Sequence, residues 1–202
     1  MHAVLENIVQ RFSRELNGLD LDTVQRHPLE KSYLWGIQEI VEHLVLSYRL
    51  STRELEGCLA KGRVAGRQRR TPVQWVLQLM VLSFGHFPRG APALEETMPG
   101  VGFMPAADGE DLAALLRKEL ELLDEVLGRC RRQYGMERVA ADPILGPMRV
   151  DQWRRFHFIH TAHHLEQLLR VKNELAPEVN RSNVFSVALA EKLRIPAQRS
   201  VT

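Results

Sequence analysis

The sequence predicts an all-α protein, a single domain built as a bundle of helices. Apolar residues recur at intervals of three and four in five segments, the spacing of one face of an α-helix. No segment shows the strict apolar–polar alternation of a half-buried strand. With 202 residues, of which 45% are hydrophobic, the chain can bury one full core. We expect one domain over residues 1–202, with its core at about 3–173 and a C-terminal extension at 174–202.

The first three helices are predicted from apolar spacing and from the residues at their ends. Apolar residues repeat at helical spacing over residues 3–16 and again over residues 32–59. A third helix is expected to begin at Thr71, a good capping residue, because Pro72 suits the first helical position. The apolar pattern of this third helix continues to about Phe84.

The second half of the chain contains two longer helices separated by a turn. A connection rich in proline and glycine, FPRGAPALEETMPGVGFMP, follows the third helix and is too irregular to be helical. The clearest helix of the chain is expected at 111–134, and the last long one at about 150–173. Between them, residues 142–147 have the composition of a turn. Four long helices and a shorter one favour a bundle in which one connection crosses over.

Net charge, hydropathy and cysteine content limit the partners and the cellular location that we expect for this protein. The formal net charge is only +2, so we expect no nucleic-acid partner. No apolar stretch is long enough to cross a bilayer and the start lacks a secretory leader, so we expect a cytoplasmic protein without a membrane partner. Cys58 and Cys130 are far apart in sequence and are expected to be reduced. A basic run lies at 61–70, either as a solvated loop or as a surface that attracts an anionic ligand.

Histidines are concentrated in the last helix, in the segment FHFIHTAHHLEQLL. His160 and His164 lie one turn apart and project from the same helix face, as two ligands of one metal must. The best third ligand is His43 on the second helix, where the small residue Ser47 leaves room for a metal. Glu39, one turn before His43, is expected to orient its ring or to accept a proton.

Two further residues of the last helix continue the histidine stripe. Trp153 and His157 lie on the same face and are expected to line the pocket around the metal. A histidine pair at this spacing also occurs by chance on many helices. The alternative from spacing alone is therefore a pair of hydrogen-bonded core histidines.

Three stretches of sequence resemble a known family. LWGIQEIVEHLVLSYRL, which contains His43, resembles the second-helix motif of the DinB/YfiT-like superfamily. HTAHHLEQLL resembles the last-helix motif of the same superfamily, H-x-x-H-H-x-x-Q, and begins at His160. The longer stretch ADPILGPMRVDQWRRFHFIHTAHHLEQLL is similar to one bacterial branch of it, described only as a domain of unknown function.

The resemblance implies a fold and a set of ligands. The fold is an up-down-down-up four-helix bundle with additional short helices. The metal ligands are His43, His160 and His164, whereas the middle histidine, His163, is not a ligand in that pattern. The resemblance also implies that the chain forms a homodimer through a helix face.

The activity implied by the resemblance is less specific. Some members of the superfamily transfer thiols of the bacillithiol or glutathione type, others isomerise maleylpyruvate with a thiol cofactor, and many have no assigned reaction. Three histidines leave a fourth position of zinc, nickel or a similar divalent metal open. That position suits a low-molecular-weight thiol, for transfer to a small-molecule substrate, or a water molecule, for hydrolysis. The alternative is a non-catalytic metal-binding bundle that acts in stress response or as an interaction module.

Overall fold

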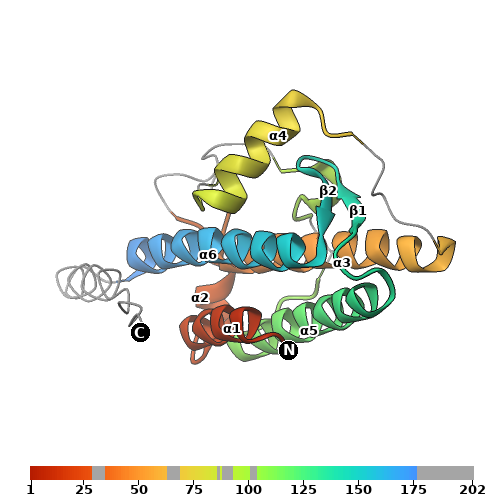
Figure 1. Ribbon diagram of the computed structural model, residues 1–202. Helices are drawn as coiled ribbons and strands as arrows, with labels where there is room; N and C mark the ends of the chain where they lie inside the picture. Colours follow the sequence, from red (N-terminus) through yellow and green to blue (C-terminus); the bar gives the residue numbers. More distant parts are fainter. Residues whose placement is uncertain (29–34, 63–68, 86, 88–92, 101–103, 177–202) are drawn as a thin grey trace, which may run out of the picture.

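The computed structural model describes residues 1–28, 35–62, 69–85, 87, 93–100 and 104–176. Most of these residues are helical, and two short strands form a single hairpin (Figure 1). The elements in chain order are α1 (Ala3–Leu16), α2 (Leu21–Gln25), α3 (Ile37–Lys61), α4 (Pro72–Gln78), η1 (Leu79–Ser83), η2 (Glu95–Thr97), α5 (Gly109–Tyr134), β1 (Arg138–Asp142), β2 (Gly146–Arg149) and α6 (Val150–Leu175).

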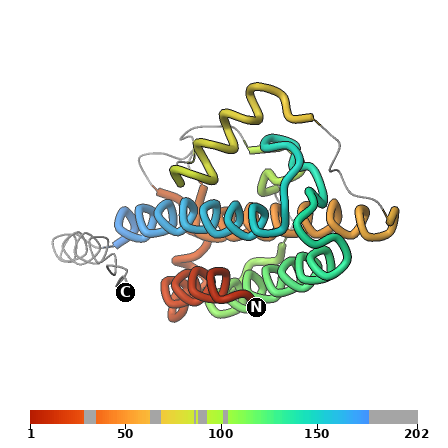
Figure 2. The backbone as a smooth tube through the Cα atoms, viewed as in Figure 1, coloured from red at the N-terminus to blue at the C-terminus, as the bar shows by residue number. Residues whose placement is uncertain are grey.

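Four long helices form the predicted up-down-down-up bundle. Helices α1 and α6 run in one direction, and α3 and α5 run in the opposite one (Figures 1 and 2). Helix α5 packs against both α3 and α1, and α6 packs against the same two helices. Because α3 and α5 are consecutive long helices that run the same way, the chain needs the long connection between them. The all-α fold predicted from the sequence is confirmed.

The core forms because each long helix buries one stripe of apolar side chains. On α1, the residues at intervals of three and four, Leu5, Ile8, Phe12 and Leu16, are completely buried. The equivalent stripe of α5 includes Leu112, Leu116, Leu120, Leu123 and Leu127. Each such side chain contributes about 1.5–3 kcal/mol of hydrophobic stabilisation when it is fully buried.

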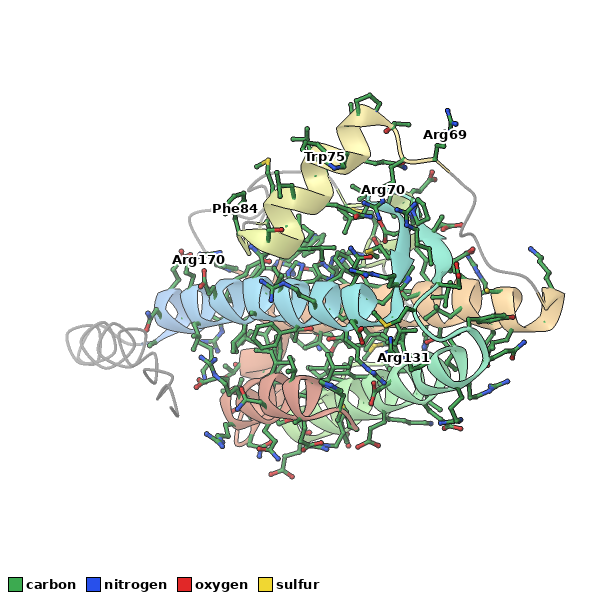
Figure 3. The ribbon with its side chains drawn as sticks, in the orientation of Figure 1. Arg69, Arg70, Trp75, Phe84, Arg131 and Arg170 are labelled. Carbon is green, nitrogen blue, oxygen red and sulfur yellow. The ribbon has the colours of Figure 1, made fainter. Side chains whose placement is uncertain are left out.

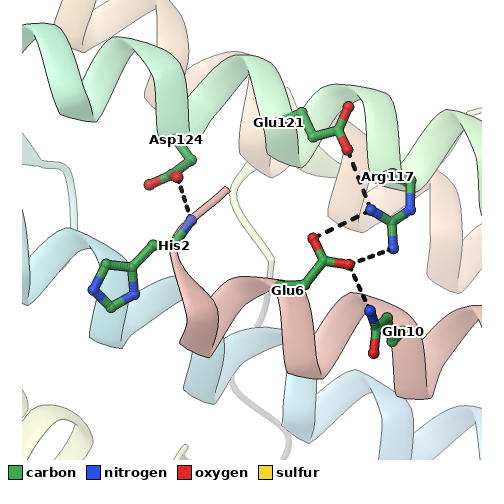
Figure 4. A network of polar contacts seen from close by, with 6 residues as sticks. All are labelled: His2, Glu6, Gln10, Arg117, Glu121 and Asp124. Carbon is green, nitrogen blue, oxygen red and sulfur yellow. Dashed lines mark hydrogen bonds and ion pairs between the residues drawn. The ribbon is translucent and has the colours of Figure 1, made fainter.

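A close backbone approach and a group of polar contacts join α1 to α5. At Gly109 an added Cβ would lie 2.0 Å from the backbone oxygen of Leu16, so only glycine fits there. Further along, the Arg117 guanidinium lies 2.8 Å from Glu6 of α1 (Figure 4). The backbone N–H of His2 donates to the Asp124 carboxylate over 2.7 Å. These contacts fix α1 along the surface of α5.

Two predicted helices differ from the structure in detail. The helix expected from residue 32 begins at Ile37, with Gly36 as its N-cap, and residues 32–34 lie outside the described residues. The helix predicted from Thr71 begins as expected at Pro72, capped by the Thr71 side chain. Its last turn widens to π-helix over Leu79–Ser83. The Arg155 side chain of α6 donates to the backbone oxygen of Leu82 in this turn.

The prediction that the chain contains no strands is wrong for one short segment. Strands β1 and β2 pair antiparallel, with Arg138 opposite Arg149 and Asp142 opposite Gly146. The predicted turn at 142–147 is the turn of this hairpin, in which the Asp142 carboxylate accepts from the backbone N–H groups of Ile144 and Leu145. Each strand is short and is buried without alternation, so neither has the periodicity by which strands are recognised.

The hairpin links α5 to α6, and helix α4 lies over it (Figure 1). The Gln78 side chain of α4 donates to the backbone oxygens of Leu145 and Pro147, over 2.8 Å and 3.3 Å. Strand β2 then leads directly into α6, whose last helical residue is Leu175. The predicted C-terminal extension at 174–202 therefore begins within α6, and its residues beyond 176 lie outside the described part. None of the described helices is both long and apolar enough to cross a membrane.

Candidate metal centre

Helices α3 and α6 pack side by side and bring three distant histidines together. His43 comes from α3, and His160 and His164 come from successive turns of α6. Nearby, the hydroxyl group of Tyr48, five residues after His43, and that of Thr161, the residue after His160, hydrogen-bond over 2.6 Å. This buried contact sets the register of the two helices and thereby places His43 opposite His160.

One potential ligand nitrogen from each of the three imidazoles lies within 4.8 Å of the other two. The Nε2 atom of His160 lies 3.2 Å from that of His43 and 3.1 Å from that of His164. In a tetrahedral site with metal–nitrogen bonds of about 2.0–2.1 Å, two ligand nitrogens are roughly 3.3 Å apart. The separations therefore suit a single ion bound between the rings. All three side chains are buried, with 5–6% of their surface exposed.

Hydrogen bonds orient two of the three rings. The Nδ1–H group of His43 donates to the backbone oxygen of Thr97 over 2.7 Å. His164 Nδ1 lies 2.9 Å from the side-chain oxygen of Gln167, one turn further along α6. A donor proton on Nδ1 leaves the lone pair on Nε2, which is the tautomer that a metal ligand needs. His160 Nδ1 is buried and has no hydrogen-bond partner among the described residues.

Burial keeps these histidines neutral. Loss of solvation lowers the pKa of His164 to about 3 and lowers that of His160 well below its ordinary value. The pKa of His43 is also lowered, mainly by burial, although its bond to Thr97 acts in the opposite direction. A protonated imidazole cannot bind a metal, so a group of neutral histidines suits a cation better than a group of charged ones.

Aromatic rings surround the three histidines. Trp35, at the end of the segment before α3, lies against His43 with ring centroids 4.8 Å apart. Phe156 of α6 stacks on His160 at 5.5 Å, and Phe87 stacks on the same ring at 5.2 Å. Apolar rings of this kind lower the local dielectric constant, which would strengthen the interaction of a bound ion with its ligands.

The two predicted pocket residues on α6 lie deeper in the core. His157 is completely buried, faces Tyr48 and stacks on Trp153 with ring centroids 5.9 Å apart. Neither residue belongs to the group of three histidines. The reason is the rise of the helix, about 1.5 Å per residue, which places Trp153 roughly 10 Å from His160 along α6.

The structure gives Glu39 and Ser47 other partners than those predicted. The Glu39 carboxylate accepts from the backbone N–H of Gly36 over 2.7 Å and thus caps α3, while Thr97 takes the predicted place beside His43. The Ser47 hydroxyl, expected to border the metal, donates to the backbone oxygen of His43. The Glu39 carboxylate therefore caps the start of α3, and its expected role as a proton acceptor near the metal stays a prediction.

A pocket of about 240 Å³ lies at the start of α3, and none of the three histidines lines it. Its walls include the side chains of Glu39 and Glu42 and the apolar residues Val24 and Met104. Glu42 is almost completely buried, and loss of solvation raises its pKa. The carboxylates make this pocket unsuitable for an anionic ligand.

Some residues around the histidines were not predicted from the sequence. Thr97 acts through its backbone oxygen, which leaves no signature in the side chain. Phe87 comes from the irregular connection, where no periodicity indicates which residues face the core. Gln167 had a signal, because it is the last residue of the H-x-x-H-H-x-x-Q motif and lies three residues after His164.

The group of potential ligands has three members among the described residues. Three histidines hold one ion and leave one tetrahedral position for a molecule that is not part of the protein, as in catalytic rather than structural zinc sites. The arrangement can therefore bind a divalent metal of the kind that imidazole prefers. Zinc, nickel, copper and iron all meet that requirement.

Comparison with known proteins agrees with this architecture. The family model described as the DinB superfamily matches residues 5–168, which include all three histidines. A search of curated proteins and a search of solved structures found no significant match. The family match covers most of the chain and confirms the resemblance seen in the two histidine motifs. The chain belongs to the DinB superfamily.

Proposed function

We propose that this member of the DinB superfamily is a metal-dependent enzyme that activates a low-molecular-weight thiol. His43, His160 and His164 are the proposed ligands of one divalent metal. The observation that carries the proposal is the convergence of their three Nε2 atoms, with separations of 3.1 and 3.2 Å at His160. Both separations are close to the spacing expected for nitrogens that share one ion.

The surroundings of the histidines support a bound cation over a group of ordinary core histidines. A buried histidine without a metal normally finds a hydrogen-bond partner for its polar atoms. Here the rings of His43 and His164 direct their Nε2 atoms toward His160, although the neutral imidazoles together have few protons to share. Thr97 and Gln167 bind the opposite sides of the outer rings and hold the lone pairs toward the centre.

The proposed chemistry follows from the open position. A bound metal lowers the pKa of a coordinated thiol, so that a thiolate forms at neutral pH. The resemblance to the thiol-transferring members of the family favours a thiol over water in this position. Release of the thiol proton to solvent would precede attack of the sulfur on an electrophilic carbon, where a carbon–sulfur bond forms as the leaving group departs with the electron pair of its bond to that carbon.

Metal analysis of the purified full-length protein tests the proposed ligands. We expect about one metal ion per chain in the wild type, and loss of most of it in His43→Ala and His160→Ala. His163→Ala is the matched control, because His163 lies next to His164 on α6 but outside the group of three. The ligand assignment is wrong if the metal content of His160→Ala equals that of His163→Ala.

A second candidate function is a metal-stabilised bundle without catalysis. The observation that favours it is the burial of all three histidines beneath aromatic rings, which restricts the space for a substrate. The two candidate functions differ in whether the protein converts a thiol to a product. The enzyme predicts that bacillithiol or glutathione is conjugated to a chlorodinitrobenzene electrophile, with loss of chloride, by the wild type and not by His160→Ala. The metal-stabilised bundle predicts that metal raises the melting temperature while no thiol turns over.

A further inference from the structure

A cluster of three arginines lies near the N-terminal end of α6, where α4 covers the hairpin. Arg138 of β1 and Arg149 of β2 are directly paired across the two strands. Arg70 lies two residues before α4, over the hairpin (Figure 3). Arg70 is close enough to the other two arginines for their charges to lower its pKa, although burial is the larger cause.

Several contacts hold α4 over the hairpin and so place Arg70 beside the strands. An added Cβ at Gly146 would lie 2.7 Å from the side-chain oxygen of Gln74, so α4 approaches the hairpin closely at its first turn. One turn later, Gln78 donates to two backbone oxygens of the hairpin. The position of Arg70 therefore follows from packing of the element that it precedes.

In the described part of the chain, no carboxylate forms an ion pair with the cluster. None of the three arginines has an ion-pair partner among the described residues, whereas nearby Arg131 lies 3.3 Å from Asp151. The Nε atom of Arg70 is buried and lacks a hydrogen-bond acceptor in the described part of the chain. Like charges directly opposite on two strands are destabilising, and a buried donor without an acceptor is costly. An anion bound by these arginines would offset both costs.

The chemistry of the three side chains indicates which anion would bind. Guanidinium groups offer pairs of parallel N–H donors that match the oxygens of phosphate. Arg149 also precedes α6 directly, so the positive end of the dipole of that helix adds to the potential. We propose that Arg70, Arg138 and Arg149 bind a phosphate-type oxyanion. This site is separate from the three histidines and does not depend on their proposed function.

Two sources could supply such a group. One is the phosphoryl group of a soluble ligand. The other is the headgroup of an anionic lipid, because α4 beside the cluster exposes large apolar side chains. Trp75 is 57% exposed and Phe84, just after η1, is 74% exposed (Figure 3). An exposed apolar helix face next to arginines is the arrangement with which peripheral proteins bind membrane surfaces. The lipid source would revise the expectation that the protein has no membrane partner.

Thermal unfolding of the full-length protein in sodium phosphate and in sodium chloride of equal ionic strength tests the site. Phosphate stabilises many proteins without specific binding. Specific binding is therefore judged from how much less phosphate raises the melting temperature of a variant than that of the wild type. We expect Arg138→Gln and Arg149→Gln to weaken phosphate binding about tenfold or more, because each removes charge-assisted hydrogen bonds. In chloride alone, Arg138→Gln should melt at a higher temperature than the wild type, because repulsion from Arg149 is removed.

The matched control is Arg14→Gln, which removes the same charge from an exposed position on α1. It should leave the effect of phosphate unchanged. The proposal is overturned if phosphate raises the melting temperature of Arg138→Gln and Arg149→Gln as much as that of the wild type. Sedimentation with vesicles of phosphatidylglycerol, compared with phosphatidylcholine, then separates the sources. Binding to the former that Arg138→Gln abolishes identifies a lipid headgroup, whereas phosphate binding without vesicle binding identifies a soluble ligand.

Discussion

At the scale of single residues, the three histidines differ in how firmly their rings are held. The Nδ1 atoms of His43 and His164 have partners in Thr97 and Gln167, whereas that of His160 has none among the described residues. The partner of His43 is a backbone oxygen, so no side-chain substitution removes it. The partner of His164 is a side chain and can be tested directly.

We expect Gln167→Leu to weaken metal binding by about 10- to 100-fold, because the His164 ring loses the group that fixes its orientation and tautomer. Gln167→Glu is the matched variant, since it keeps an acceptor oxygen at the same position and should retain most of the affinity. Competition with a chelator of known affinity measures the difference. Equal affinities for Gln167→Leu and the wild type would show that Gln167 does not support a ligand.

His157 is a further buried histidine, and it affects how folding stability depends on pH. Neither of its ring nitrogens has a hydrogen-bond partner among the described residues, and burial lowers its pKa to about 3. The unfolded chain binds this proton near pH 6.5, at the ordinary pKa of histidine. Between about pH 6.5 and pH 3 the unfolded state therefore gains a proton that the folded state cannot accept. Folding stability falls across this interval by about 1.4 kcal/mol per pH unit for this one group.

His157→Leu removes the group that takes up this proton and puts an apolar side chain of similar size in its place. Relative to the wild type, we expect the variant to gain about 2 kcal/mol of unfolding free energy as the pH is lowered from about 7 to about 5. Urea unfolding of the two metal-free proteins at both pH values measures this gain. If the two proteins lose stability in parallel on acidification, His157 is protonated in the folded state and the prediction is wrong.

At the scale of helices, α1 and α5 approach so closely that one position admits only glycine. An added methyl group at Gly109 would lie 2.0 Å from the Leu16 backbone oxygen, which cannot move without displacing the end of α1. The same helix contains Gly128, where the nearest atom to an added Cβ is the mobile end of Arg132, 3.6 Å away. The two glycines of α5 therefore have different structural roles.

This difference predicts opposite effects of the same substitution. Gly109→Ala should lower the free energy of unfolding by about 1–3 kcal/mol, because α1 must move away from α5. Gly128→Ala should raise it by up to about 1 kcal/mol, because alanine favours the helix and nothing obstructs its methyl group. Chemical unfolding of both variants measures the two changes. Stabilisation by Gly109→Ala would mean that α1 does not pack against α5 as described.

At the scale of the whole molecule, α3 and α5 enclose both cysteines in the shared core. Cys130 is completely buried and Cys58 is 7% exposed, and neither of the two cysteines forms a disulfide. Burial, and to a smaller extent the nearby Cys58, raises the pKa of Cys130 to about 11. The thiolate is the reactive form, so the folded protein protects this thiol both by burial and by its protonation.

We expect a water-soluble disulfide reagent at about pH 8 to label Cys130 in the folded protein at least a hundredfold more slowly than in urea. Labelling should then follow opening of the bundle and become faster with denaturant. The absorbance of the released thiol, with Cys58→Ala to isolate Cys130, gives the rate. Rapid labelling of Cys130 without denaturant would indicate that α3 and α5 separate locally in the native state.

The sequence by itself determined the features that depend on local periodicity. The spacing of apolar residues was enough to predict the long helices, and the i, i+4 spacing placed His160 and His164 on one face, because both follow from 3.6 residues per turn. Periodicity did not link His43 to this pair. The small residue Ser47 and the family resemblance suggested it, and the packing of α3 on α6 brings it to the same point, 117 residues from His160 in sequence. The tertiary structure also decided that the backbone oxygen of Thr97 accepts from His43, and that Arg70 lies near enough to Arg138 and Arg149 for their charges to act on it. Such contacts depend on how separate elements pack, and the periodicity within one element carries no information about its neighbours.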